Sequence, residues 1–202
     1  MESSFVCATP SQHVAFPTIF RTWERSKWPA HNCTVVEVAR ATSASPFFFK
    51  SVEIGDADAK ETFVDAGLTC NNPVQYVLKE AESLSSIAGM SCIVSLGSGM
   101  PNVIGLNQPD AFQKLLPKNF IKLLKDIALD CEATGQEVAR KFTNEPDFYF
   151  RLNVDRGLQS VSLAEWDKLG TVKTHTDQYM LRHEVTTKIT IIVKHLRPHV
   201  SS

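Results

Sequence analysis

The sequence has no excess of charge of one sign and no long uncharged stretch. Its 202 residues include 21 Lys and Arg against 22 Asp and Glu, so the formal net charge is -1. Broad capture of nucleic acid or of an anionic membrane surface needs clustered cations, and the sequence shows no such cluster. No uncharged run approaches the roughly 18 residues that span a bilayer, and the first residues lack the pattern of a secretory leader. We therefore expect no nucleic-acid partner, no transmembrane segment and a cytoplasmic location.

Cysteine is too sparse for a disulfide framework. There are five, an odd number, and they are widely scattered: Cys7, Cys33, Cys70, Cys92 and Cys131. This distribution indicates reduced thiols, which we interpret as small hydrophobic residues of the core. His31 and Cys33 have no second pair of ligands at zinc-site spacing, so they indicate a surface loop. We expect no metal and no cofactor.

The serine elbow of many hydrolases, G-x-S-x-G, is also missing. That motif places a nucleophilic serine on a sharp turn, and none of the nine glycines shows its spacing. Gly97, Ser98 and Gly99 lie closer together, and they lack the Lys-Ser/Thr end of a phosphate-binding Walker loop. We interpret them as a structural turn after a strand.

What the chain does contain is one acidic residue at the end of a predicted strand. Residues 61–64 lead to Asp65, the small residues Ala66 and Gly67 follow it, and Asn71 and Asn72 then precede a predicted helix. A strand end fixes the carboxylate, and the small residues leave its face open to a ligand. Without its flanking segments, an aspartate in this position is more often only the cap of a turn or helix.

Hydrophobic periodicity predicts alternating strands and helices. We expect strands over 3–9, 61–64, 91–96 and 148–154, and helices over 34–45, 73–84 and 119–142, with two helical pieces in 174–196. Strands and helices in alternation favour α/β layers. Residues 100–117 are rich in turn formers and should be irregular. The run Phe47–Phe49 is expected to pack in the core or to line an apolar pocket.

The order of these segments resembles the second half of the patatin-like phospholipase domain. Ala41–Phe48 is similar to the family's A-T-S-A-A-P, Phe63–Pro73 to its D-G-G-L-x-x-N-N-P and Val94–Gly99 to its S-L-G-T-G. The segment from Asp130 to Thr176 is similar to patatin modules of large multidomain fungal proteins. The resemblance therefore covers nearly the whole chain.

This resemblance implies a fold and its division. Residues 1–115 would form an incomplete three-layer α/β/α domain with a mixed, mostly parallel sheet. Residues 116–202 would form a helical extension packed on the same domain. A missing half of the domain would leave an unpaired sheet edge, which favours self-association.

The resemblance also implies a function in lipid degradation. The family hydrolyses ester bonds of phospholipids or neutral lipids with a serine-aspartate dyad, and Asp65 matches the position of the dyad acid. Ala66, Gly67, Asn71 and Asn72 match the turn or substrate-binding positions. Ala66 stands where the family has glycine, so a Cβ there would crowd the pocket or, at positive φ, cost roughly 1 kcal/mol. The serine and the oxyanion loop would lie upstream, and the chain alone is expected to be inactive.

Two interpretations of the function remain open. The chain is either a fragment of a lipid acyl hydrolase or a non-catalytic, partner-binding or regulatory remnant of one. The four C-terminal histidines favour solvent-facing positions over membership of a hidden catalytic triad: His175, His183, His195 and His199. Lys118, Lys122 and Lys125 indicate a solvated helix face.

Overall fold

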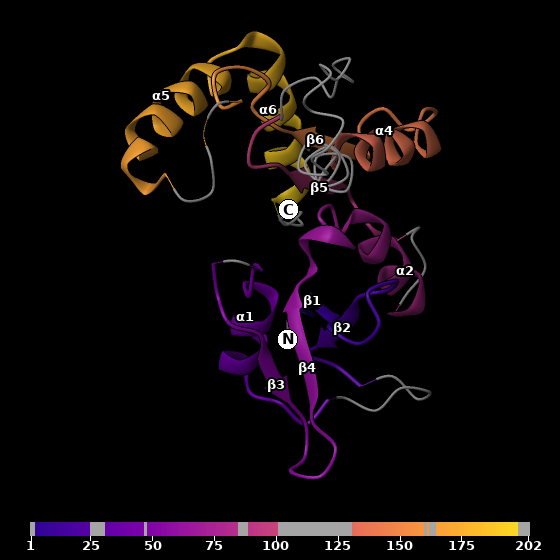
Figure 1. Ribbon diagram of the computed structural model, residues 1–202. Helices are drawn as coiled ribbons and strands as arrows, with labels where there is room; N and C mark the ends of the chain where they lie inside the picture. The colour runs from indigo at the N-terminus through magenta and orange to yellow at the C-terminus, as the bar shows by residue number, and fades with distance from the viewer. Residues whose placement is uncertain are drawn as a thin grey trace, which may run out of the picture. The chain divides into compact units, whose positions relative to one another are not determined.

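The computed structural model describes residues 3–24, 31–46, 48–84, 89–100, 131–159, 161 and 165–197. These belong to two compact units (Figure 1), unit 1 over Met1–Asn71 and unit 2 over Asn72–Ser202. The predicted boundary near residue 115 lies outside the described residues. The division into 1–115 and 116–202, like the three-layer arrangement, therefore stays a prediction.

Unit 1 is built on a four-stranded sheet in the order β2-β1-β4-β3. Its strands are β1 (Phe5–Pro10), β2 (Thr18–Arg21), β3 (Val52–Ile54) and β4 (Glu61–Asp65). Every pairing in it is antiparallel, so the expectation of a mostly parallel sheet is wrong for this unit. For the β1–β2 and β3–β4 pairs the reason is connection length, because the turns that join them, over 11–17 and 55–60, are short and a parallel pair needs a crossover of a dozen or more residues.

One helix, α1 (Val35–Thr42), contacts this sheet. It begins as predicted at Thr34, whose hydroxyl accepts the Glu37 N–H while the Glu37 carboxylate accepts the Thr34 N–H. This reciprocal pair satisfies two backbone donors that a helix start leaves open. The core between helix and sheet is apolar: Ala8, Phe20, Ala41, Ala44, Val52, Ile54 and Phe63.

Two features of unit 1 differ from the sequence expectation. Phe48 and Phe49 are 48% and 69% exposed, so they are not core residues, and Phe47 lies outside the described residues. Both of their N–H groups donate to the Ser45 carbonyl, so the two residues belong to a turn between α1 and β3. Strands β2 and β3 were not predicted; β3 has only three residues, and its signal is one exposed glutamate between buried Val52 and Ile54.

Unit 2 contains a parallel pair of strands, β5 (Ile93–Leu96) and β6 (Tyr149–Leu152). A long connection that includes α4 (Cys131–Lys141) separates them, which permits the parallel arrangement. Before β5 lies α2 (Val74–Leu84), and after β6 follow a short 3-10 helix (Trp166–Lys168), α5 (Leu169–Met180) and α6 (His183–Leu196). Both strands lie within ranges that the sequence predicted as strands, 91–96 and 148–154.

The helices of unit 2 largely agree with their predicted positions. The two helical pieces expected over 174–196 are α5 and α6, and α4 is the described part of the helix expected over 119–142. Residues 119–130, the irregular segment over 101–117 and the three lysines of the predicted solvated face lie outside the described residues. No described helix combines the length and apolar character required to cross a membrane.

Candidate functional site

Asp65 is the last residue of β4 and lies at the boundary between strand and turn. Its neighbour across the sheet is Ala8 of β1, and its N–H donates to the Ala44 carbonyl at 3.0 Å. Backbone bonds on both sides therefore fix the position of its Cα. Its side chain is half-buried, so part of it remains accessible to a ligand.

The carboxylate of Asp65 is oriented by the turn that follows. Its Oδ1 accepts the Gly67 N–H at 2.9 Å and caps the short 3-10 helix η1 (Ala66–Leu68). Its Oδ2 has no hydrogen bond to any residue that the structure describes. The capping role expected of an isolated aspartate is therefore present, and one oxygen still has the capacity to accept a proton.

Ala66 fits its position without strain. It belongs to the 3-10 turn, whose backbone has negative φ, and its side chain is buried in unit 1. A Cβ at this position therefore points into the protein interior, and the left-handed conformation for which glycine would be needed is absent. The position of Gly67 would also accommodate a side chain, because a Cβ there would lie 3.6 Å from the Asp65 carboxylate oxygens, an ordinary contact distance.

Two pairs of side chains join the end of this turn to β1. The Thr9 and Thr69 hydroxyls lie 2.7 Å apart, and the Sγ atoms of Cys7 and Cys70 lie 3.5 Å apart. The hydrogen bond to Cys7, together with burial, raises the pKa of the Cys70 thiol strongly. Periodicity could not reveal these contacts, because each joins residues about sixty positions apart.

The two asparagines of the predicted site differ in environment. Asn71 is exposed at the end of unit 1, whereas Asn72 is buried at the start of unit 2. The Asn72 Oδ1 accepts the Val74 N–H at 3.3 Å, and its Nδ2 donates to the Cys131 carbonyl at 3.0 Å. Asn72 thus organises the start of α2. A substrate-binding role for either asparagine stays a prediction.

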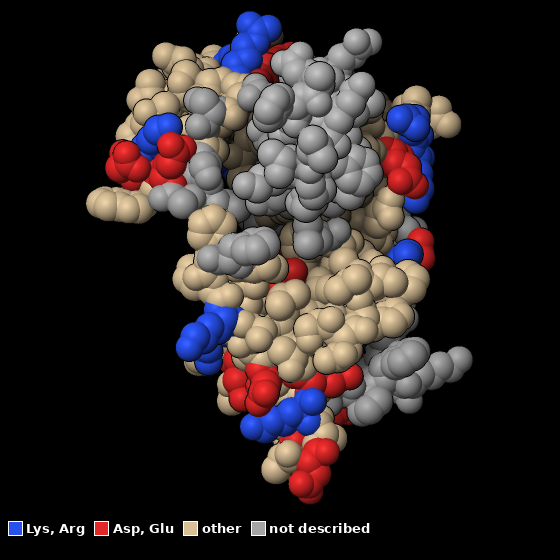
Figure 2. All heavy atoms as spheres, viewed as in Figure 1, with Lys and Arg blue, Asp and Glu red and all other residues tan. Residues whose placement is uncertain are grey.

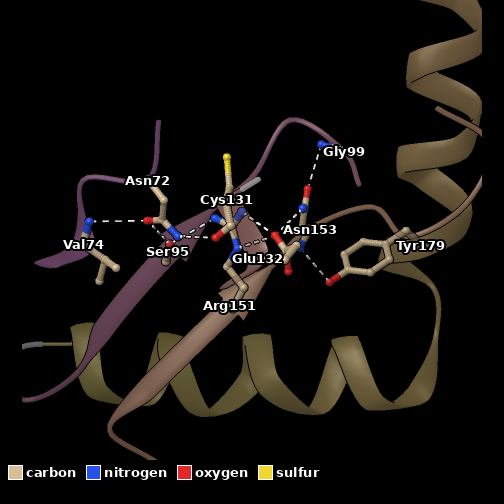
Figure 3. A network of polar contacts seen from close by, with 9 residues as sticks. All are labelled: Asn72, Val74, Ser95, Gly99, Cys131, Glu132, Arg151, Asn153 and Tyr179. Atoms are coloured by element: carbon tan, nitrogen blue, oxygen red, sulfur yellow. Dashed lines mark hydrogen bonds and ion pairs between the residues drawn. The ribbon is translucent and has the colours of Figure 1, made fainter. Parts of the chain in front are cut away.

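Asn72 belongs to a buried polar network in unit 2 (Figure 3), which the sequence analysis did not identify. Its centre is the Glu132 Oε1, which accepts from the Arg151 Nη2 and from the Asn153 Nδ2, each at 2.7 Å. The Arg151 Nη1 donates to the Ser95 hydroxyl at 3.1 Å, and that hydroxyl approaches the Asn72 Oδ1 at 3.4 Å. The side chains of Arg151 and Glu132 are only 14% and 19% exposed.

The turn after β5 is part of this network, which agrees with the structural interpretation of its glycines. The Gly99 N–H donates to the Asn153 Oδ1 at 2.7 Å. Gly99 has a backbone φ of 120°, a value that residues other than glycine rarely adopt. A Cβ on Gly97 would lie 2.3 Å from the same Asn153 oxygen. Both glycines are thus required by close approach and backbone conformation.

The remaining sequence candidates do not converge on a second site in the described residues. His183 is exposed, His175 and His195 are half-buried, and His199 lies outside the described part of the chain. None of the five cysteines forms a disulfide. Cys7 is buried and Cys33 packs, partly buried, against the core of unit 1, so the interpretation as core residues is correct for these two. Among the described residues, no group of three or more His, Cys, Asp or Glu could hold a metal ion.

Comparison with known proteins supports the resemblance for the first part of the chain. Residues 5–78, which contain Asp65, match the model of the patatin-like phospholipase family. The chain is also 34% identical over 91 residues to the "probable inactive patatin-like protein 9" of Arabidopsis thaliana. That similarity covers 41% of this chain and 24% of the plant protein, so the chain spans about a quarter of the relative that it matches.

Proposed function

We propose that unit 1 carries the acid side of a patatin-like serine-aspartate site, and that this chain by itself does not hydrolyse esters. The observation that carries the proposal is the carboxylate of Asp65, held at a strand end within the matched segment 5–78 with one oxygen oriented by Gly67. The G-x-S-x-G elbow is absent from the 202 residues, so the alcohol would have to come from another polypeptide segment.

In such a site Asp65 acts on the serine rather than on the lipid. A serine hydroxyl placed within about 3 Å of the Asp65 Oδ2 would transfer its proton to that oxygen as it attacks the ester carbonyl. The bond from the Gly67 N–H engages the Oδ1 and leaves the Oδ2 as the oxygen available to the serine. Backbone amides near the serine would hold the developing oxyanion, and they belong to the segment that supplies the serine.

The substrate class follows from the family alone. Patatin-like phospholipases act on lipids, and we extend to this chain the hydrolysis of phospholipid or neutral-lipid esters as a proposal. The exposed Phe48 and Phe49 support it, because they are apolar and follow closely after Ala44, whose carbonyl accepts the Asp65 N–H.

A non-catalytic function is the second candidate, and one comparison favours it. The plant relative is itself named as a probable inactive protein, and it is 34% identical to this chain over 91 residues. In this case the chain would act by binding a partner. The described strands β2 and β3 have neighbours on one side only, and such edges accept a further strand from a partner or a second copy.

The first experiment measures hydrolysis by the 202-residue chain. The unmodified chain should hydrolyse a short-chain nitrophenyl ester no faster than the Asp65→Asn variant does. A fluorophosphonate probe should label no serine. Asn retains the capping oxygen but is not basic, so the two proteins should fold alike. Turnover that is lost in Asp65→Asn would refute the claim that the chain alone is inactive.

The second experiment separates the two candidates. The coding sequence upstream of Met1 is read in the same frame for a G-x-S-x-G, and any longer protein found is assayed as a whole. If Asp65 is the dyad acid, Asp65→Asn should lower ester turnover by about 10³-fold or more. Asp58→Asn, in the exposed turn before β4, is the matched control and should retain full turnover. Equal activity of both variants would contradict the proposed role of Asp65.

A further inference from the structure

Cys7 and Cys70 face each other from segments that are far apart in the sequence. Their Sγ atoms lie 3.5 Å apart, and a covalent disulfide requires about 2.0 Å. Cys7 is 7% exposed on β1, and Cys70 is half-buried directly after the turn that begins at Asp65. Rotation of the two side chains could close the remaining gap, while the backbone is already held from both sides.

A second contact fixes the same two segments independently. Cys7 and Thr9 are two residues apart on β1, so their side chains lie on the same face of the strand. Thr9 meets Thr69 through a 2.7 Å hydroxyl pair, next to the place where Cys7 meets Cys70. The Cys70 N–H also donates to the Ala66 carbonyl at 2.7 Å. The approach of the two sulfur atoms is therefore defined by several bonds and not by one flexible side chain.

We propose that Cys7 and Cys70 form a modification site, an intramolecular disulfide made by peroxide and reversed by thiols. This goes beyond the proposed hydrolase site and does not depend on it. The disulfide would tie β1 to the turn that carries Asp65 and Gly67, across the long loop that separates the two cysteines in the sequence.

The reaction balances with one hydrogen peroxide as the oxidant. The Cys70 thiol, the more exposed of the two, loses its proton to water, and its sulfur attacks one peroxide oxygen. The O–O bond breaks, and the departing hydroxide takes up a proton to become water. The Cys7 sulfur then attacks the Cys70 sulfenic sulfur, the S–O bond breaks, and the hydroxyl leaves with the Cys7 proton as a second water. The two sulfurs lose one electron each, and the peroxide gains two.

The rate should depend steeply on pH. The hydrogen bond to Cys7 and burial raise the pKa of Cys70, so little thiolate is present at neutral pH and the first step is slow. Below that pKa, each additional pH unit should accelerate disulfide formation by about tenfold, because the thiolate fraction rises by this factor.

The test is peptide mapping of the intact chain after peroxide treatment. Cleavage after Lys and Arg places each of the five cysteines on a different peptide, with Cys7 in 1–21 and Cys70 in 61–79. We expect a species in which these two peptides are linked, lighter by two hydrogen atoms and separated by a thiol reductant. Cys92→Ser, which removes a half-buried thiol of unit 2, should give the same linked pair.

Amide hydrogen exchange reports whether the bond holds the turn. The Thr69 and Cys70 amides both donate to the Ala66 carbonyl, and after oxidation they should exchange about tenfold or more slowly. Peroxide-treated Cys70→Ser should show no such change. The proposal is overturned if Cys7 and Cys70 stay unlinked or link only to other cysteines or between chains. It is also overturned if the link forms only in denaturant or leaves exchange at the turn unaltered.

Discussion

The two units differ in what they bury. Among the described residues, Thr9 is the one fully buried polar side chain of unit 1, whereas unit 2 buries Asn72, Glu80, Ser95 and Asn153. Unit 2 also nearly encloses the Arg151–Glu132 ion pair. An apolar core gains stability in proportion to the area it removes from water. A buried polar network is tolerated only while every member keeps its partners, so unit 2 should respond sharply to single polar substitutions.

The largest effect should come from the apolar core of unit 1. Phe63 is 1% exposed and packs edge-on against Phe20 with their ring centroids 5.2 Å apart. Phe63→Ala should lower the free energy of unfolding of unit 1 by about 4 kcal/mol, because it removes buried area and leaves a cavity. Urea denaturation followed by hydrogen exchange at β1 and β4 would measure it. Phe49→Ala, at an exposed ring, should change stability by less than about 0.5 kcal/mol.

Next in size is the ion pair of unit 2. Arg151→Met leaves the Glu132 carboxylate enclosed without its cation, which should cost about 3 kcal/mol. The exposed pair Lys173–Asp177 is the control, and Lys173→Met should cost less than about 0.5 kcal/mol. The double variant Glu132→Gln/Arg151→Met should lose less than the two single variants together. Equal losses of unfolding free energy for Arg151→Met and Lys173→Met would mean that enclosure of the Arg151–Glu132 pair does not increase its effect on stability.

Two glycines of unit 2 should respond with opposite sign to the same change. A Cβ on Gly97 would overlap the Asn153 side chain, which cannot move away without breaking its bonds to Gly99 and Glu132. Gly97→Ala should therefore cost about 2 kcal/mol. Gly170 of α5 has open space around it, and Gly170→Ala should gain about 0.5 kcal/mol by restricting the unfolded chain. Thermal unfolding of both variants tests this, and a shift in the same direction would contradict it.

The smallest effect concerns pH and the pair formed by Asp155 and Arg182. The hydrogen bond from Arg182 holds the pKa of Asp155 below its usual range. Because this pKa is lower in the folded chain, the stabilisation is complete above about pH 4 and is lost as the pH falls through the folded value. In Arg182→Gln the Asp155 pKa should return toward its usual range, as followed by NMR titration of the carboxylate. An unchanged titration would show that the pair does not perturb Asp155.

How much of this the sequence could predict depends on how local the signal is. The start of α1 was predictable because Thr34 and Glu37 lie within one turn, and α5 and α6 because their apolar residues recur at helical spacing. The direction of the strands in unit 1 was predicted wrongly, because it was inferred from the family resemblance, whereas the short turns over 11–17 and 55–60 indicate antiparallel β1–β2 and β3–β4 pairs.

For the candidate site, the sequence identified Asp65 and the turn but not what surrounds them. The contacts of Thr9 with Thr69 and of Glu132 with Arg151 join residues distant in the chain, and no periodicity records such pairs. One signal was available for the network: Arg151 and Asn153 are polar residues in a segment whose neighbours are mostly apolar. A polar residue within a buried strand requires a partner, although its identity is fixed only by the fold.

The pairing of β1 with β4 has a consequence for the order of folding. It brings Ala8 next to Asp65, so the chain between them must close into a long loop before that pairing contributes any stability. The backbone hydrogen bonds of helix α2 join close neighbours in the sequence, so this helix can form early. Asp65 should accordingly be among the last groups to reach its native position during refolding. It becomes correctly placed only after β1 has paired with β4.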